Sequence, residues 1–417
     1  MTMLARRSAA ETRVVMALEN CSYPEDVRVR AEAEELVRAG CAVTVLAPRA
    51  RGQARRAVVD GVAVRRYRLP ERTGAAGIAL EYALACVQLS VLVLAELRRG
   101  ANVLHLHNPP DLLFAIARLA RLAGATVVFD HHDLAPELYA QKFGAGWPVA
   151  VLRWCERMTM RSADVVLAAN ESHRQVAIER GGVAPQRVSV VRNGPRASTL
   201  VERPRVRDGE LGDPRLCFVG ALGAQDGVRA LPEIVARLRD AGLAPRLTVV
   251  GDGPELPAIR RLAVELGVGE SVTLTGRVAH REVPALIERA DVCLDVAPCN
   301  PLNHRSTMIK IGEYLAAGKP IVTFALEETR RTAGECALYA PDGDLDAYCE
   351  LIARLCREPE LRRRLAREGV QRARDLTWER SAVRLREAYG LMSTQGPQLG
   401  PPELGRQRAE VRARWAR

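Results

Sequence analysis

The sequence predicts an α/β protein made of two doubly wound halves, each built around a parallel β-sheet. The chain has 417 residues, which is too long for one ordinary hydrophobic core, so two domains are expected. Short apolar runs typical of β-strands alternate with amphipathic helical patterns along most of the chain. This alternation stops at residues 193–214, a segment with several prolines and glycines, and then starts again.

The first half contains seven apolar runs that are expected to form strands. Amphipathic stretches such as Asp26–Arg38 and Leu112–Ala123 fill most of the gaps, which indicates βα units. The predicted strands are Val14–Leu18, Ala42–Ala47, Val62–Tyr67, Val103–Leu106, Thr126–Phe129, Val165–Ala168 and Val188–Val191.

The second half repeats this pattern with five strands and then becomes helical after Asp344. We interpret Asp344 as the N-cap of Leu345–Arg357 and not, with Asp342, as a metal-nucleotide site. The predicted strands are Leu216–Val219, Leu247–Val250, Val272–Thr275, Val292–Val296 and Ile321–Phe324. The predicted helices are Val228–Asp240, Glu255–Leu266, Glu282–Arg289, Ser306–Ala317, Leu345–Arg357, Leu361–Asp375 and Trp378–Leu391.

These patterns predict a domain order along the chain. The expected parts are a first α/β domain at 1–195, a linker at 196–214, a second α/β domain at 215–375, a helix at 376–394 that packs back on the first domain, and a basic tail at 395–417. Ligands of doubly wound sheets bind at the carboxyl ends of the strands. With two facing halves, we expect the ligands in the cleft between them.

Composition narrows the function classes. The net charge of +11 favours an anionic partner, but aromatic residues make up 4% of the chain and do not alternate with basic ones, so nucleic acid is not expected. The ten Cys contain no C-x-x-C pair, which predicts small core residues in a reducing compartment.

Met1–Arg13 lacks the apolar core of a signal peptide. Glu81, Gln88 and Glu96 interrupt the apolar stretch Ala75–Leu97, so a buried helix is favoured over a membrane span.

Lys310 and Glu313 are the first candidate ligand-binding pair. They lie three residues apart in the predicted helix Ser306–Ala317 and therefore share one helical face near its start. A helix N-terminus and a Lys attract phosphate, and a carboxylate accepts hydrogen bonds from both ribose hydroxyls. A surface ion pair is the alternative interpretation.

Two glycine-rich turns follow strands in the second half. Gly251 and Gly253 come directly after one predicted strand, and Gly220 and Gly223 follow another. Glycine allows a backbone to approach a ligand closely, although any βα turn favours it. The spacing is not G-x-G-x-x-G, so a diphosphate loop stays possible and a dinucleotide fingerprint is not supported.

A polar segment ends a strand of the first half. Asp130, His131, His132, Asp133 and Glu137 crowd one strand end, and core packing does not require that composition. A metal site with His105 and His107 is the chemical alternative. Because His105 and His107 flank Leu106, we expect one to face inward and the other the cleft; we assign His105 to the core, and His107 with Asn108 to the cleft.

Together these motifs resemble family 4 glycosyltransferases of the GT-B fold, in which two Rossmann-like domains face each other across a cleft. The resemblance covers about residues 13–391 and is strongest at Val249–Glu255, Asp291–Asp295, Asn300–Val322 and Ala333–Ala340. The run from Asn300 to Glu313 resembles a bacterial subgroup associated with polysaccharide assembly.

The resemblance implies that the domain at 1–195 binds the acceptor and that the domain at 215–375 binds the nucleotide-sugar donor. It also implies roles for particular residues. His132 lies beside the donor sugar, with Asp130 and His131 as further catalytic candidates, and His107, Asn108 and Glu137 lie on the acceptor side. Glu313 binds the donor ribose. The remaining donor-binding candidates are Lys310, Arg305, Ser306, Thr307, Gly220, Gly223, Gly251, Gly253 and Arg277.

Some positions depart from the family pattern. Arg305 stands where the first Glu of an E-x7-E pair is common, and Gln225 and Asp226 replace the usual basic residues of a phosphate-holding turn. Pro24–Arg28 replaces a Gly-Gly turn.

The resemblance implies a retaining transferase that needs no metal and no cofactor. It would move a sugar from a nucleotide-sugar donor to a glycan or polyprenyl-linked acceptor during cell-surface polysaccharide assembly. The expected location is cytoplasmic, with possible contact with the acidic inner membrane surface. The alternatives are a soluble acceptor, a non-catalytic GT-B subunit and a nucleotide-sugar 2-epimerase.

Overall fold

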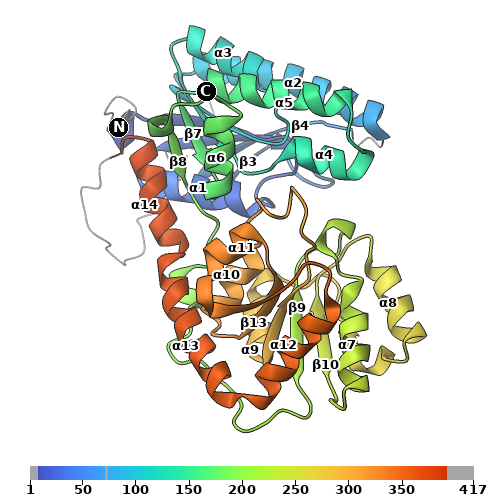
Figure 1. The fold of residues 1–417 in the computed structure, drawn as a ribbon. Helices are drawn as coiled ribbons and strands as arrows, with labels where there is room; N and C mark the ends of the chain where they lie inside the picture. The colour runs from blue at the N-terminus through green and yellow to red at the C-terminus, as the bar shows by residue number, and fades with distance from the viewer. Residues whose placement is uncertain (1–7, 71–73, 392–417) are drawn as a thin grey trace. The chain divides into compact units, whose positions relative to one another are not determined.

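The computed structural model describes residues 8–70 and 74–391. The chain divides into an N-terminal unit, residues 1–192 with 381–417, and a C-terminal unit, residues 193–380 (Figure 1). The predicted basic tail at 395–417 lies outside the described residues.

The N-terminal unit is built on an eight-stranded sheet with the order β3-β4-β2-β1-β5-β6-β7-β8. All neighbouring strands are parallel except β3 and β4. The strands are β1 Arg13–Ala17, β2 Ala42–Pro48, β3 Arg56–Val59, β4 Val62–Tyr67, β5 Val103–His107, β6 Thr126–His131, β7 Val165–Ala168 and β8 Val188–Val190. The helices are α1 Val27–Arg38, α2 Gly74–Arg98, α3 Phe114–Leu122, α4 Ala135–Phe143, α5 Trp147–Ser162, α6 Glu171–Glu179 and α14 Trp378–Ala388, which enters this unit at Ser381.

The C-terminal unit is built on a six-stranded, fully parallel sheet with the order β11-β10-β9-β12-β13-β14. The strands are β9 Arg215–Val219, β10 Arg246–Val250, β11 Val272–Leu274, β12 Val292–Asp295, β13 Ile321–Phe324 and β14 Ala337–Ala340. The helices are α7 Ala230–Asp240, α8 Leu256–Glu265, α9 Val283–Glu288, α10 Ile309–Ala316, α11 Glu327–Ala333, α12 Leu345–Arg357 and α13 Pro359–Asp375.

The two parallel-sheet units confirm the predicted fold class, and all twelve predicted strands are present within about two residues of their predicted ends. Strands β3 and β14 were not predicted; they are short strands at the edges of the two sheets. The Asp344 side chain accepts a hydrogen bond from the Ala347 amide at 2.9 Å, which confirms the predicted N-cap of α12.

The segment predicted as a linker packs against the C-terminal unit. Leu211 is buried, the Val201 amide donates to the Ala316 carbonyl, and Arg207 pairs with Asp291 at 3.0 Å. The segment therefore extends the C-terminal unit and contributes to its core.

Topology explains why polar residues gather where they do. In each sheet the chain order reverses beside the first strand, β1 next to β5 and β9 next to β12. Loops at the carboxyl ends of these strands diverge and leave room for a ligand. The candidate residues of both units lie at or after the carboxyl ends of β5, β6, β9, β10, β11 and β12.

Candidate functional site

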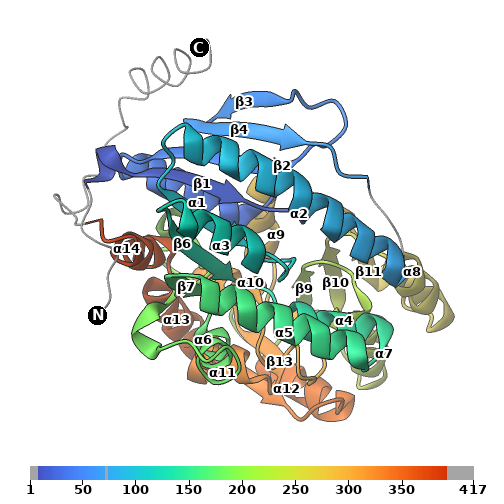
Figure 2. The same ribbon diagram turned by 90° about the horizontal axis from the view of Figure 1, so that it is seen from above.

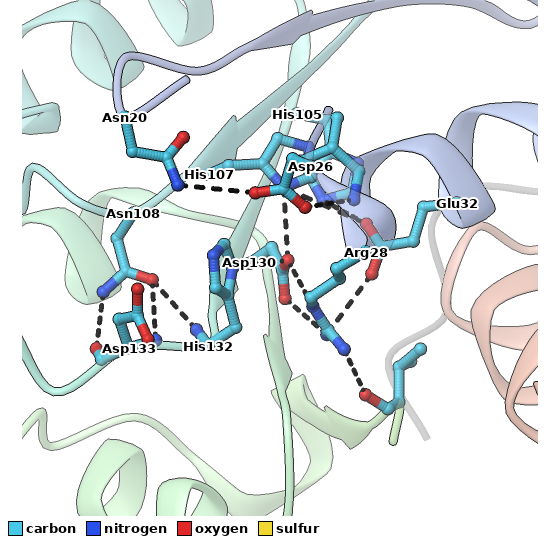
Figure 3. Close-up of polar contacts among 12 residues, drawn as sticks. Asn20, Asp26, Arg28, Glu32, His105, His107, Asn108, Asp130, His132 and Asp133 are labelled. Carbon is cyan, nitrogen blue, oxygen red and sulfur yellow. Dashed lines mark hydrogen bonds and ion pairs between the residues drawn. The ribbon is translucent and has the colours of Figure 1, made fainter. Parts of the chain in front are cut away.

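A buried charge network lies at the carboxyl ends of β5 and β6 in the N-terminal unit (Figure 3). Its centre is Asp130, which is fully buried. Arg28 of α1 donates to both carboxylate oxygens, from Nε at 2.7 Å and from an Nη at 2.6 Å. His107 Nδ1 and His132 Nδ1 lie 3.1 Å and 2.9 Å from Asp130 Oδ2.

These contacts fix the orientation of His132. Since Nδ1 faces Asp130, Nε2 is the ring nitrogen left for a substrate. The Asn108 side chain holds the same turn, because its Oδ1 accepts hydrogen bonds from the amides of His132 and Asp133 at 2.9 Å and 3.2 Å. The His132 side chain is 9% exposed, so it sits at the edge of the buried network.

The charges of this network shift its pKa values. Burial opposes the charged form of His132, but the charge of Asp130 and the hydrogen bond to it raise the His132 pKa to about 9. Burial would raise the pKa of Asp130, but the charges of Arg28 and His132 hold it well below its usual range. Burial and the Asp130 charge raise the pKa of Glu32 to about 8. At neutral pH the network therefore contains a protonated His132 and a protonated Glu32.

His131 points to the opposite face of β6, because successive strand residues alternate. It is fully buried, and its Nε2 lies 3.0 Å from Glu156 of α5. Glu156 in turn pairs with Arg180, which also binds Glu137. The structure thus separates His131 and Glu137 from Asp130 and His132, and we assign them to the packing of α4, α5 and α6.

His105 and His107 lie on the same face of β5, so the expectation that they face opposite ways is wrong. Residues two apart in a strand share a face, and the two rings are 4.2 Å apart. His105 is a core residue as predicted, with its Nδ1 2.8 Å from the hydroxyl of Tyr389. His107 and Asn108 are also buried, and both make internal contacts with the turn that carries His132.

A second group of candidates gathers at the carboxyl ends of β9, β10 and β12 in the C-terminal unit. Lys310 of α10 is 7% exposed, and its Nζ donates to Asp295 Oδ1 at 3.1 Å. The same ammonium lies 4.5 Å from the centre of the Phe218 ring. A methyl group on Gly220 would lie 3.3 Å from Lys310 Nζ, so the ammonium borders the first turn of this unit.

Glu313 lies one helical turn beyond Lys310 on α10. Burial raises its pKa, against the opposing effects of His280 and Lys310. It is half-buried. A carboxylate in this position can accept hydrogen bonds from sugar hydroxyls that replace lost water contacts.

The predicted helix start at Ser306 is wrong, because α10 begins at Ile309. Arg305, Ser306 and Thr307 lie in the preceding turn instead. The Asn303 side chain donates to the carbonyls of Gln225 and Pro298, both at 2.9 Å. These hydrogen bonds tie that turn to the glycine-rich turn after β9.

Gly251 and Gly253 have a structural reason to be glycine. A Cβ on Gly251 would lie 1.8 Å from the Gly220 carbonyl oxygen, and one on Gly253 would lie 2.5 Å from that of Leu222. The two turns are joined by hydrogen bonds from the Gly220 and Leu222 amides to the carbonyls of Val250 and Asp252. The glycines thus let the two turns at the ends of β9 and β10 pack on each other.

The other two donor-side candidates differ in position. The Gly223 amide donates to Asp226 within the first turn, at 3.2 Å. Arg277 is exposed and follows Gly276, which pairs with Gly251 in an isolated bridge. Both therefore lie near the turns after β9 and β10.

Known families match both units. The family described as "Glycosyl transferase 4-like domain" matches residues 26–194, and "Glycosyl transferases group 1" matches residues 213–358. These matches together cover more than half of the chain. The chain belongs to the group 1, family 4-type glycosyltransferases.

Named relatives agree with this family. The chain is 24% identical over 229 residues to an alpha-D-kanosaminyltransferase of Streptomyces kanamyceticus, covering 53% of this chain and 58% of the relative. It is 28% identical over 355 residues to a phosphatidyl-myo-inositol mannosyltransferase of Mycobacterium leprae, covering 79% and 87%. Membership of this family therefore identifies the chain as a hexosyltransferase-type enzyme.

A solved structure supports the fold. The crystal structure of Anabaena HepE with UDP and glucose aligns with a TM-score of 0.68 over 91% of this chain and 100% of that chain, at 14% identity. At that identity the likeness establishes the GT-B fold of this glycosyltransferase, and its substrates are a separate question.

Four residues that the sequence did not single out are central to the two groups of candidate residues in this transferase. Arg28 and Glu32 pack beside Asp130, Asp295 holds Lys310, and Asn303 ties two turns together. Asp295 carried a detectable signal, since it is a charge at the end of an apolar strand. Arg28 and Glu32 look like ordinary helix-surface residues, and only their partners show otherwise.

The N-terminal network also contains four possible metal ligands. Atoms of Glu32, His105, His107 and Asp130 lie within 4.8 Å of one another, and all four residues are buried. However, both Asp130 oxygens already accept hydrogen bonds, and the Arg28 guanidinium lies 3.3 Å from Glu32 and 2.6 Å from Asp130. The guanidinium already supplies the positive charge that a cation would bring, so the set fits an internal charge network.

Proposed function

We propose that this glycosyltransferase moves a hexosyl group, with retention of anomeric configuration and without a metal, from a nucleotide sugar to a glycan or lipid-linked acceptor. The donor binds the C-terminal unit, and the N-terminal unit binds the acceptor and contributes His132. The proposed role is cell-surface polysaccharide assembly, in the cytoplasm or at the inner face of the membrane.

The observation that carries the proposal is the position of Lys310. Its ammonium is held at the strand ends by Asp295 and borders the backbone of Gly220. Lys310 and the nearby backbone N–H groups would stabilise the charge that develops on the leaving diphosphate. A fixed cation there supplies what a metal ion supplies in other transferases.

His132 supplies the second part of the proposal. The Asp130 carboxylate directs Nδ1 inward and supports the protonated ring, so Nε2 can donate a hydrogen bond to a sugar oxygen near the reacting carbon. Asp130 is a positioning residue, because all its contacts are internal.

The acceptor has two chemical candidates among relatives. The Mycobacterium leprae relative is named for a lipid, phosphatidyl-myo-inositol, and a second Streptomyces kanamyceticus relative is named as a 2-deoxystreptamine glucosyltransferase. We favour a lipid-linked acceptor, because the N-terminal unit exposes apolar helices beside basic residues. A soluble aminocyclitol is the second candidate.

The test is thermal unfolding of the purified chain with UDP-, GDP-, ADP- and dTDP-sugars. A ligand at 100 times its Kd stabilises the folded state by about 2.7 kcal/mol. We expect one nucleotide to raise Tm in the parent chain and in Glu270→Ala, an exposed control, and to lose this effect in Glu313→Ala.

Product analysis with the donor so identified completes the test. Transfer that continues in EDTA and yields the same anomeric configuration as the donor supports the proposal. Absence of any stabilisation by the four nucleotide types, a requirement for metal, or an inverted product would each overturn it.

A further inference from the structure

Four helices of the N-terminal unit form one outer layer. Helices α2, α3 and α5 lie side by side, and α4 lies next to α5 (Figure 2). Large apolar side chains on α2 recur with the spacing of one helical face, and those on α5 do the same. The outward residues are Leu80, Leu84, Val87 and Val91 on α2. On α5 they are Trp147, Val151 and Trp154. We call these seven residues, with Leu122 of α3 and Phe143 of α4, the helix face.

The helix face is unusually exposed for such residues. Trp147 is 79% exposed, Trp154 52%, Val87 65% and Leu122 85%. The Trp154 ring packs edge-on against Phe114 of α3 at 5.4 Å, so it is held facing outward and does not fold back into the core. Large exposed apolar side chains gathered on neighbouring helices indicate a binding surface.

The charges around the helix face are positive. Exposed basic residues on the four helices include Arg98, Arg118, Arg121, Lys142, Arg157 and Arg161. Their acidic residues are turned inward or partly covered. Glu96, Glu137 and Glu156 are buried and paired with Arg65, Arg180 and other arginines, and Glu81 is half-buried.

We propose that the helix face binds the surface of an acidic lipid bilayer, with Trp147 and Trp154 in the headgroup region and the basic residues on lipid phosphates. Trp suits the interface because its ring is apolar and its N–H is polar. Lys and Arg extend their charges to the phosphates while their stems cover apolar surface. A second copy of the chain fits less well, since two such faces would oppose positive charge to positive charge.

The helix face lies along the bilayer in this proposal, although α2 is long and apolar enough to cross one. Residues Ala79–Arg98 make up the apolar part of α2, but the inner side of this helix is packed on the unit. Ala85, Leu89 and Val93 are buried, Gln88 donates to the Arg68 carbonyl at 2.9 Å, and Glu96 pairs with Arg65. Crossing the bilayer would expose these groups, whereas lying in the interface keeps them packed.

This inference deepens the proposed function, because a protein held at the bilayer reaches a lipid-linked acceptor. The membrane contact itself can be tested without a substrate. The full chain is sedimented with vesicles of phosphatidylcholine alone and with vesicles containing one quarter phosphatidylglycerol. The variants are Trp147→Ser with Val91→Ser, and Val264→Ser as a control that is 69% exposed on α8.

We expect the parent chain and Val264→Ser to bind the acidic vesicles and the double variant to bind roughly tenfold less. Acyl-brominated lipids should quench the parent's tryptophan fluorescence and quench that of the double variant less. Unchanged Tm of the double variant shows that folding is intact.

Three results would overturn the inference. One is equal binding by the parent and the double variant, which would assign vesicle binding to other basic segments. Another is binding that disappears completely in high salt, since apolar insertion survives screening. The third is a dimer in sedimentation equilibrium that the double variant loses. Nucleotide stabilisation is scored separately, so loss of vesicle binding leaves the donor-site test intact.

Discussion

The two units hold their buried charges in different ways. In the N-terminal unit, Asp130 accepts four hydrogen bonds from Arg28, His107 and His132. In the C-terminal unit, among the described residues, the ammonium of Lys310 donates one hydrogen bond, to Asp295, and otherwise faces the Phe218 ring. Asp130 has little capacity left, whereas Lys310 keeps two N–H donors.

This difference separates positioning from binding. A saturated network fixes the geometry of its members, and here it fixes His132. A partly used cation is ready to accept an anion, and Lys310 has that property at the strand ends of a parallel sheet. The N-terminal network should therefore respond to mutation mainly in stability and turnover, and the C-terminal pair mainly in donor affinity.

The largest expected effect comes from removing the cation of the N-terminal network. Arg28→Met leaves Asp130 buried without its main partner, so we expect a loss of about 3–5 kcal/mol in the free energy of unfolding. Arg30→Met, on the same helix but partly exposed and 3.8 Å from Glu34, should cost less than about 1 kcal/mol. Urea unfolding measures both, and equal effects would show that Asp130 does not depend on Arg28.

The next effect tests whether Asp130 acts through His132. Asp130→Asn keeps the shape of the side chain but removes the charge that supports the protonated ring. We expect kcat to fall about 10²- to 10³-fold with little change in KM for the donor. The double variant Asp130→Asn with His132→Gln tests this link. If its kcat is no lower than that of Asp130→Asn alone, the two residues act together. If the losses of the two single variants add up in the double variant, Asp130 does not act through His132.

The third effect is a pH dependence of stability. The pKa of His132 is raised from 6.5 to about 9, so the folded state holds this proton more tightly than the unfolded state. The resulting stabilisation is fully present below about pH 6.5 and is lost as pH rises through about 9, up to about 3 kcal/mol. The raised pKa of Glu32, about 8, acts in the same direction.

Chemical unfolding at pH 6.5 and pH 9.5 measures this loss. We expect a smaller decline in His132→Gln than in the parent chain, and a parent-like decline in His280→Gln, whose side chain is exposed. Identical declines in all three proteins would mean that His132 is not protonated in the folded state.

The smallest expected effect is on donor binding by the Lys310–Asp295 pair of the C-terminal unit. Lys310→Met removes the ammonium that borders Gly220, and loss of a charge-assisted hydrogen bond should weaken donor binding by about 10- to 100-fold. Isothermal titration calorimetry with the stabilising nucleotide measures this, with exposed Arg260→Met as control. Unchanged donor affinity in Lys310→Met would mean that Lys310 does not bind the donor. The proposed contrast between the Asp130 network and the Lys310–Asp295 pair would then fail.

Local sequence patterns determine most of the strands and several helix positions of this protein. Apolar runs of four to six residues predicted the strands, Asp344 caps α12 as expected, and the short spacing of Lys310 and Glu313 places both on α10. These features depend on neighbours in sequence, so they can be read from it. The edge strands β3 and β14 were missed because short strands give weak patterns.

Tertiary structure decided which residues meet. Arg28 and Asp130 are 102 positions apart, and they pair because folding brings the start of α1 to the carboxyl end of β6. His131, the next residue, points to the opposite face of the strand because side chains alternate, and there it contacts Glu156 of α5. The outer sides of α2 and α5 are exposed because the sheet can cover only one side of each helix. Composition marks such helices as apolar, but the strand order and the packing decide which side faces outward, since burial depends on contacts distant in sequence.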